Sequence, residues 1–206
     1  MTTRTIVVTG ATGDAGRATA TALLAAGHTV VAIGSDAERL ATVLATHRYA
    51  ADLSDVAATA ALAARVRAEV GPVDGLVHLV GGWRAGHDDA DWAWLEPRIL
   101  TTLRSASLAF FDDLAASPAG RLVAVGSVSA AKPTWSGANY AVLKTAADAW
   151  MTAAASGFRS GGTAAAVSLM VRSIGPDGTP PETLAAAIVP LWDAPAAELN
   201  GAHLTL

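Results

Sequence analysis

The chain has 206 residues, a formal net charge of −4 and no cysteine, and 52% of its residues are hydrophobic against 16% charged. This composition supports one domain with a buried core, and it excludes disulfides, thiolate nucleophiles and cysteine-based metal sites. Without a basic run or a long apolar stretch, we expect a cytoplasmic protein with no nucleic-acid partner, no membrane segment and no bound metal.

Short β-branched runs alternate with alanine-rich stretches, which predicts alternating strands and helices. The predicted strands are residues 5–8, 29–33, 48–50, 75–80, 121–125, 163–171 and 202–206. The predicted helices are residues 14–26, 36–46, 55–70, 91–116, 139–156 and 181–192. Continuous apolar runs such as GLVHLV indicate strands covered on both faces. We therefore predict one Rossmann-type doubly wound α/β domain over residues 1–206, a parallel sheet of about seven strands with helices on both faces.

The first predicted strand leads into a glycine-rich turn, TGATGDAG at residues 9–16, and then into a helix. In such a turn Gly10 permits the tight bend, Gly13 lets the backbone approach a pyrophosphate, and Gly16 lets the helix pack on the strand. The free N–H groups at the helix N-terminus favour phosphates. The strand–turn–helix setting predicts dinucleotide binding. Asp14 is interpreted as the N-cap of the helix, with its carboxylate turned away from the phosphates.

Tyr140 and Lys144 lie four residues apart at the start of a predicted helix, and Ser127 follows the strand RLVAVG thirteen residues before Tyr140. At this spacing the tyrosine and the lysine share a helix face. The lysine charge would lower the tyrosine pKa from about 10 toward working pH. Tyr140 would then exchange a proton with a carbonyl or alcohol oxygen that Ser127 holds. Singly, these residues are explained as a helix-surface pair and a strand end, but together they predict catalysis.

With these motifs the chain resembles the short-chain dehydrogenase/reductase family over essentially its whole length, and its TGxxGxxG spacing is closest to extended and atypical members. The resemblance implies hydride transfer between NAD(P) and a carbonyl or alcohol substrate, with Tyr140 as the general acid/base and Lys144 on the nicotinamide ribose. It places Asp52 near the adenine ring, although capping the next helix is an equal alternative. The predicted cofactor-binding residues are Gly10, Thr12, Gly13, Asp14, Ala15, Gly16, Ser35, Asp52, Leu53, Gly81, Gly82, Tyr140 and Lys144.

The chain also departs from the family pattern. His78, Leu79 and Val80 precede Gly81 where the family has the asparagines and alanine of an NNAG motif. Thr102 most nearly takes the position of the catalytic asparagine, which usually supports a water linking the lysine to solvent. The Pro-Gly pair after the sixth strand is missing, and the C-terminal region is too short for the usual helices over the substrate. We therefore expect an open site, or one completed by a neighbouring subunit.

Residues after the fourth strand and before Tyr140 are predicted to shape the substrate side: Trp83, Arg84, His87 and Trp135. The tryptophans fit a pocket or an interface equally well, and Arg84 fits a substrate carboxylate or plain solvation. Cofactor choice leans to NADP over NAD, because Gly34 removes the acid that binds a ribose 2′-hydroxyl and Ser35 with Arg39 offers contacts to a 2′-phosphate. Asp36 is interpreted as the cap of the following helix.

Two other functions remain open at this point. The first is an NAD(P)-binding regulatory or interaction protein with weak or no catalysis, which the departures favour and the intact Ser127, Tyr140 and Lys144 set disfavours. The second is an isomerase or epimerase that uses bound NAD transiently, for which the chain has no substrate-domain sequence. The resemblance also implies a homodimer or homotetramer through the predicted helices 91–116 and 139–156, whose alanine-rich faces could equally pack on their own sheet.

Overall fold

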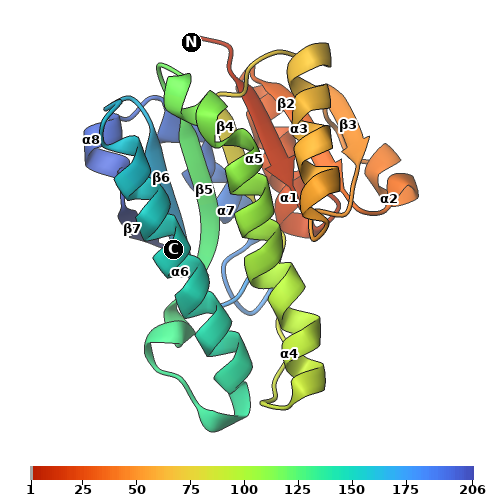
Figure 1. Ribbon diagram of the computed structural model, residues 1–206, viewed down its shortest axis with the longest axis vertical. Helices are drawn as coiled ribbons and strands as arrows, with labels where there is room; N and C mark the ends of the chain where they lie inside the picture. The colour runs from red at the N-terminus through yellow and green to blue at the C-terminus, as the bar shows by residue number, and fades with distance from the viewer. Residues whose placement is uncertain (1) are drawn as a thin grey trace.

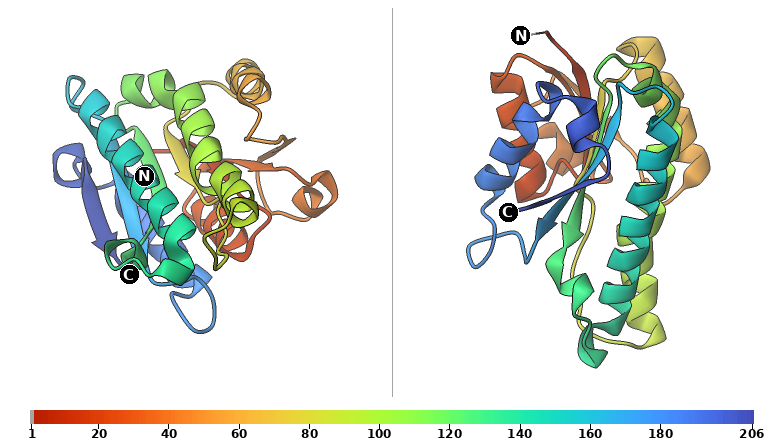
Figure 2. Two further views of the ribbon diagram at one scale, coloured as in Figure 1. Left: turned by 60° about the horizontal axis from the view of Figure 1, so that its bottom comes forward. Right: turned by 90° about the vertical axis from the view of Figure 1, so that its left-hand side faces the viewer.

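The computed structural model describes residues 2–206. Seven strands form one sheet in the order β3-β2-β1-β4-β5-β6-β7, and all of its pairings are parallel. The strands are β1 Thr5–Thr9, β2 Thr29–Gly34, β3 His47–Ala50, β4 Gly75–His78, β5 Arg121–Ser127, β6 Ala165–Val171 and β7 Ala202–Thr205. Helices cover both faces of the sheet (Figures 1 and 2). The predicted Rossmann-type doubly wound fold is therefore confirmed.

Two helical layers bury the sheet. One layer holds α1 Asp14–Ala25 and α7 Pro181–Ile188, and the other holds α3 Val56–Glu69, α5 Thr102–Ala116 and α6 Ala138–Phe158. Because successive strand residues point to opposite faces, the core divides accordingly. Val7 and Leu122 pack into the α3–α5–α6 layer, whereas Val8 and Val123 pack into the α1–α7 layer.

The remaining helical segments are short. They are α2 Ala37–Ala41, α4 Asp89–Glu96, α8 Ala196–Leu199, the π-helical turn Pro97–Thr101 and the 3-10 turns Val128–Ala131, Trp135–Gly137 and Val189–Trp192. The predicted helix 91–116 is thus a continuous rod of α4, the π-helical turn and α5. Pro97 explains the change of winding, because its nitrogen has no hydrogen to donate to the preceding turn. The predicted helix 36–46 is wrong in length, since α2 ends at Ala41.

Beyond the carboxyl ends of the strands, α4 and the first turns of α6 project as a lobe, formed by residues 83–96 and 128–142 (Figure 1). Backbone and side-chain hydrogen bonds join its two halves. The Gly86 N–H donates to the Ser136 carbonyl at 2.7 Å, and the Asn139 side chain donates to the Asp88 carbonyl at 2.8 Å.

Across residues 2–206, none of the helices combines the length and the apolar character needed to cross a membrane.

Candidate active site

The glycine-rich turn after β1 has the geometry that its sequence predicts. Gly10 has a φ of +67°, and a Cβ there would lie 2.6 Å from the Leu79 carbonyl oxygen. A Cβ on Gly16 would lie 2.3 Å from the Gly10 carbonyl oxygen, so only glycine lets α1 pack this closely on the turn. By contrast, a Cβ on Gly13 would meet nothing nearer than 3.6 Å. A side chain at Gly13 would therefore cause no clash within the protein, and its absence leaves room at the cleft for a ligand to approach the backbone.

A cleft of about 530 Å³ opens beside this turn, at the carboxyl ends of β1, β2 and β4. The predicted cofactor residues that line it are Gly10, Thr12, Gly13, Ser35, Asp52, Leu53 and Gly81. Arg39, predicted with Ser35 as a contact for a 2′-phosphate, lines it as well, and so do Arg98 and Thr102, for which no cofactor contact was predicted. This is the crevice outside the strand ends at which open α/β sheets bind ligands.

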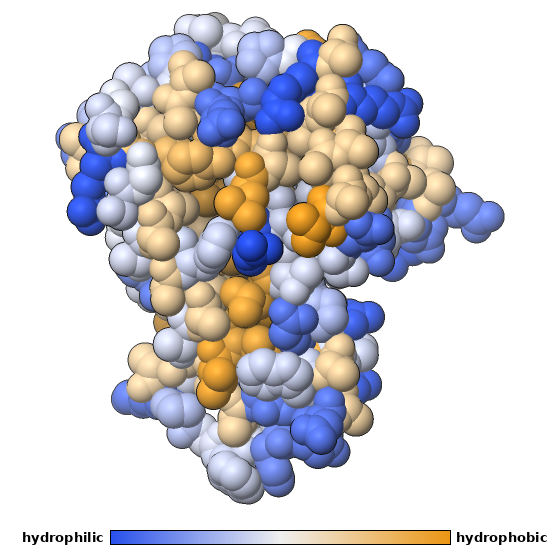
Figure 3. Space-filling view, viewed as in Figure 1, coloured by the Kyte–Doolittle hydropathy of each residue, from blue (hydrophilic) through white to orange (hydrophobic). Residues whose placement is uncertain are grey.

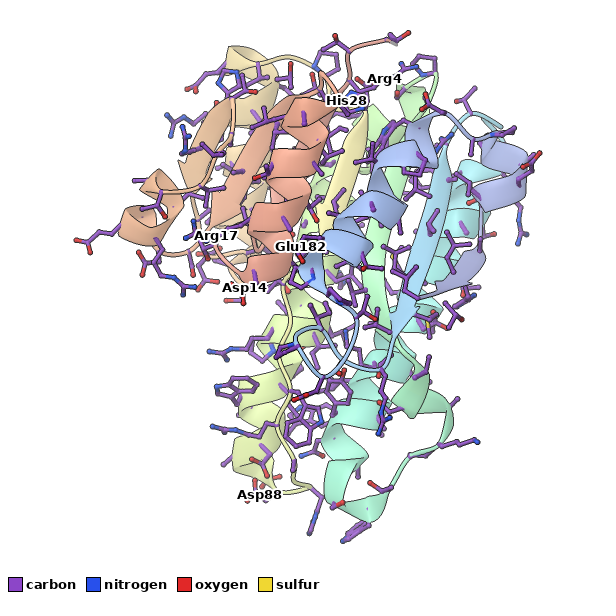
Figure 4. The ribbon with its side chains drawn as sticks, turned by 180° about the vertical axis from the view of Figure 1, so that it is seen from behind. Arg4, Asp14, Arg17, His28, Asp88 and Glu182 are labelled. Carbon is purple, nitrogen blue, oxygen red and sulfur yellow. The ribbon has the colours of Figure 1, made fainter. Side chains whose placement is uncertain are left out.

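Asp14 corrects one prediction. The N-cap of α1 is Gly13, in extended conformation, and Asp14 is the first helical residue with no capping hydrogen bond from its side chain. Gly13 therefore takes the capping position predicted for Asp14, and the Asp14 carboxylate lies outside the cleft. It lines the groove between α1 and α7, together with Arg17 and Glu182 (Figure 4). Ala15 and Gly16 also lie outside the cleft.

Asp52 lies on the wall of the cleft and does not cap a helix. Its Oδ1 accepts hydrogen bonds from the Ser54 backbone N–H at 2.9 Å and the Ser54 hydroxyl at 2.7 Å. These bonds hold the pKa of Asp52 below its ordinary value. The cap of α3 is Asp55, which accepts from the Ala58 N–H at 3.0 Å. The capping alternative for Asp52 is therefore wrong, whereas the predicted capping by Asp36 of α2 is confirmed.

A second cavity, of about 320 Å³, adjoins the cleft and contains the predicted catalytic side chains Tyr140 and Lys144. The two spaces share Leu79, Val80 and Gly81 as a common wall. Gly82 and Trp83 also line the second cavity.

Ser127 ends β5 and is buried, with its hydroxyl 2.6 Å from that of Ser129. Tyr140 lies in the first turn of α6, and Lys144 follows one turn later with its Nζ donating to the Val125 carbonyl at 2.8 Å. The Lys144 Nζ is 6.0 Å from the centre of the Tyr140 ring. The structure therefore gathers the three predicted catalytic residues at the end of β5 and the start of α6.

Burial dominates the acid–base properties of this group. It raises the pKa of Tyr140, and the Ser127 hydroxyl acts in the opposite direction. Burial also lowers the pKa of Lys144 to about 8. The predicted net lowering of the Tyr140 pKa by the lysine charge is thus wrong for the protein by itself, because loss of hydration around the phenol is the largest influence and the Ser127 hydroxyl is what opposes it.

His78 is a polar residue of the site to which the sequence assigned no role. The ring is 3% exposed, with Nδ1 2.9 Å from the Thr9 hydroxyl and Nε2 3.4 Å from the Thr102 hydroxyl. Burial, followed by the nearby Lys144 charge, lowers the pKa of His78 to about 3, so its ring is neutral. Its signal in the sequence was a lone histidine inside the apolar run GLVHLV.

The arginine that lines the second cavity is Arg172, which was not predicted, rather than Arg84. Arg84 stacks over Trp94 at 4.8 Å and lies 3.7 Å from Asp91, so its guanidinium is engaged within the lobe. Arg172, directly after β6, lines the second cavity instead. Trp83 and Trp135 are 69% and 75% exposed. Trp83 lines the cavity, whereas Trp135 packs against His87 with ring centres 4.7 Å apart.

A glycine-rich turn at the head of a parallel doubly wound sheet, a cleft beside it and a buried serine with a tyrosine–lysine pair define a Rossmann-type oxidoreductase domain. The family model of the short chain dehydrogenases matches residues 4–177, and the chain belongs to that family. A curated relative is the 2,3-dihydro-2,3-dihydroxybenzoate dehydrogenase of Bacillus subtilis (strain 168), 32% identical over 156 residues. That alignment covers 68% of this chain and 58% of the relative.

Solved structures share the fold at lower identity. An NADPH-bound short-chain oxidoreductase from Pseudomonas aeruginosa PAO1, described as containing an atypical catalytic center, superposes with a TM-score of 0.90 at 19% identity, covering 98% of this chain and 95% of the other. A gluconate 5-dehydrogenase from Burkholderia cenocepacia J2315, in complex with NADP and tartrate, superposes with a TM-score of 0.89 at 20% identity, covering 100% and 94%. At these identities the likeness establishes the fold alone.

Proposed function

We propose that this protein is an NAD(P)-dependent oxidoreductase that transfers a hydride between nicotinamide and a small carbonyl or alcohol substrate. The observation that carries the proposal is the shared wall of Leu79, Val80 and Gly81, which joins the cleft beside the glycine-rich turn to the cavity of Tyr140 and Lys144. A nucleotide that lies along the cleft therefore reaches the predicted catalytic residues.

The cleft fits a dinucleotide. Its volume of about 530 Å³ is within the usual range for cofactor sites. The first turn of α1 supplies N–H donors for a pyrophosphate, and the missing side chain at Gly13 leaves room for it to approach. We assign the pyrophosphate to Gly10, Thr12 and Gly13, and the adenosine end to Ser35, Asp52 and Leu53. Gly81, Gly82 and Lys144 would contact the nicotinamide end.

In this proposal the bound cofactor supplies or accepts the hydride, and the chain's own residues handle the substrate oxygen. Ser127 holds that oxygen by a hydrogen bond. Tyr140 donates its phenol proton to the oxygen during reduction and takes a proton from it during oxidation. The positive charge of Lys144, one helical turn away, stabilises the phenolate that forms when the proton leaves.

We propose NADP as the preferred cofactor. Gly34 leaves no acidic side chain at the end of β2, and the Asp36 carboxylate is directed to the Arg39 backbone N–H at 3.0 Å. Ser35 and Arg39 line the cleft, and Arg39 Nη2 donates to the Thr12 carbonyl at 3.2 Å. This bond holds the guanidinium beside the place where a ribose 2′-phosphate would lie.

We also propose that two or four copies associate through α5 and α6. Apolar side chains gather over these helices in the space-filling view (Figure 3), and Leu108 and Val142 are 50% and 55% exposed there.

The alternative function is an NAD(P)-binding regulatory protein with weak or no catalysis. The raised pKa of Tyr140 and the presence of His78 and Thr102 at the family's asparagine positions favour it.

The test is a fluorescence titration of the purified protein with NADPH and NADH, followed by a panel of carbonyl compounds. The chain has two tyrosines, so Tyr140→Phe can be compared with the matched change Tyr49→Phe, which removes a hydroxyl bonded to Glu69 outside the cleft. We expect carbonyl-dependent oxidation of the nucleotide that collapses with Tyr140→Phe and persists with Tyr49→Phe. Nucleotide binding without turnover of any carbonyl would favour the regulatory function, and failure to bind either nucleotide would contradict the proposal.

A further inference from the structure

A row of polar side chains crosses the sheet beneath the site. The strand register pairs Thr9 with His78, His78 with Ala124, Ala124 with Ser168, and Ser168 with His203. Residues paired in this way point to the same face of a sheet, which here is the face covered by α5 and α6, where Ala124 packs. Ala124, at the centre of the row, is the one member without a polar group.

A small cavity lies over Ala124. Its volume is about 20 Å³, and its polar lining comes from His78 and Ser168 of the sheet and from Lys144 and Asp148 of α6. Leu103 and Met151 are among the apolar residues that close it. A buried space needs about 10–15 Å³ and two to four polar partners to hold a water molecule. The cavity meets both conditions for one water.

One side of the cavity leads to solvent. Asp148 Oδ1 is 2.7 Å from Nε2 of His203 and accepts a hydrogen bond from the Ser168 hydroxyl at 3.3 Å. The His203 side chain, on the edge strand β7, is 44% exposed. The His203 imidazole therefore contacts both Asp148 and bulk water.

The opposite side is closed. Both ring nitrogens of His78 face threonine hydroxyls, of Thr9 and Thr102, so the neutral ring presents no free nitrogen to the cavity. Lys144 has three N–H donors, and one of them goes to the Val125 carbonyl. Donors therefore remain for a water in the cavity. The route away from Lys144 runs toward Asp148.

We propose that the cavity over Ala124 holds one ordered water, and that this water, Asp148 and His203 form a proton outlet connecting Lys144 to solvent at the edge of the sheet. The proposal rests on the proposed function, in which Tyr140 gains a proton whenever an alcohol is oxidised. An N–H bond of Lys144 breaks as an O–H bond of the water forms, the water passes a different proton to the Asp148–His203 pair, and His203 releases one to solvent. The Tyr140 O–H bond then breaks, and its proton restores the N–H bond that Lys144 lost. Reduction runs the same transfers backward, and no electrons move.

The water is tested without any substrate, by a crystal structure of the protein. We expect one water within hydrogen-bond distance of Lys144 Nζ and of Asp148. Ala124→Ser should put a hydroxyl in place of the water, and Ala124→Val should fill the cavity. A dry or collapsed cavity in the unmodified chain would overturn the proposal.

The link between Lys144 and Asp148 is also tested without turnover. Lys132 and Lys144 are the two lysines in the sequence, so Lys132→Arg leaves Lys144 as the single NMR-labelled lysine. Asp148→Asn should lower the Lys144 titration midpoint by about one unit, because it removes a negative charge on the far side of one water. The titratable groups facing this site are Tyr140 and Asp148 of α6, His78 of β4 and His203 of β7. Asp112→Asn, the same change on an exposed part of α5, should leave the midpoint unchanged; an equal shift there, or none with Asp148→Asn, overturns the link.

A third experiment measures turnover. With a carbonyl or alcohol that the protein accepts, Asp148→Asn and His203→Ala should each lower kcat about tenfold and enlarge its solvent deuterium isotope effect. Nucleotide affinity should stay unchanged, and added imidazole should restore kcat in His203→Ala. Undiminished kcat in both variants would refute the outlet. If no compound is turned over, the proposed function fails, while the water and the lysine titration still decide whether the outlet exists.

Discussion

Arg39 offers a direct way to separate the two nicotinamide cofactors. Arg39→Ala removes the guanidinium that the Thr12 carbonyl holds at the cleft, while Arg17 Nε still donates to that carbonyl at 3.2 Å. The cap of α2 survives, because Asp36 accepts from the Arg39 backbone. A hydrogen bond to a charged group contributes about 1.5–3 kcal/mol. Since Arg39 is exposed, we take the lower end, which corresponds to about a tenfold loss of NADPH affinity.

The assay is fluorescence titration with both nucleotides at fixed ionic strength. NADH is the internal control, because it lacks the 2′-phosphate and its affinity should change little. Arg65→Ala is the matched control variant, since it removes an exposed arginine of α3 whose pair with Glu69 lies outside the cleft. The preference for NADPH should also weaken as salt rises. Equal losses for NADPH and NADH, or no loss for either, would refute the assignment of Arg39 to the 2′-phosphate.

Three further predictions concern the turn, the fold and its pH dependence. Gly16→Ala should lower the free energy of unfolding, measured by urea denaturation, by about 3 kcal/mol or more, because its Cβ would lie 2.3 Å from a backbone oxygen. Gly13→Ala should keep the same stability but lose nucleotide affinity. Arg121→Met should cost about 3–5 kcal/mol in the same assay, because the buried guanidinium donates to the Leu191, Gly120, Thr163 and Ala194 carbonyls; a cost under 1 kcal/mol would contradict this. The pKa of His78 is lowered from 6.5 to about 3, so between these pH values the unfolded chain binds more protons than the folded one, and the free energy of unfolding should fall as pH drops from 6.5 toward 3. His78→Asn should remove that part of the pH dependence. An unchanged pH profile in this variant would count against a buried neutral ring.

The sequence predicted the fold and much of the cleft because these depend on local patterns. Apolar runs alternating with alanine-rich helices predict a parallel sheet, and the spacing of Gly10, Gly13 and Gly16 between a strand and a helix predicts the turn. The boundaries were less accurate. Whether Gly13 or Asp14 caps α1 depends on the backbone angles of the turn, which the residue types alone do not specify. Helix α2 ends early because residues 42–46 must return to β3.

The features that the sequence could not predict depend on register between strands. His78, Ser168 and His203 are distant in the chain, and only the pairings of β4, β5, β6 and β7 place them in one row. Arg172 was overlooked in favour of Arg84 for a similar reason. Both follow a strand end, but stacking on Trp94 draws Arg84 into the lobe and leaves Arg172 at the cavity.

The central claim is hydride transfer, and isotope transfer tests it most directly. The protein is incubated with NADPH carrying deuterium at the transferable C4 position and with a carbonyl compound identified in the panel, and the alcohol is examined by mass spectrometry. The account predicts one deuterium on the former carbonyl carbon, with label incorporation lost in Tyr140→Phe and retained in Tyr49→Phe. Bound NADPH that stays unoxidised with every carbonyl, or alcohol formed without deuterium from either C4 face, would contradict it.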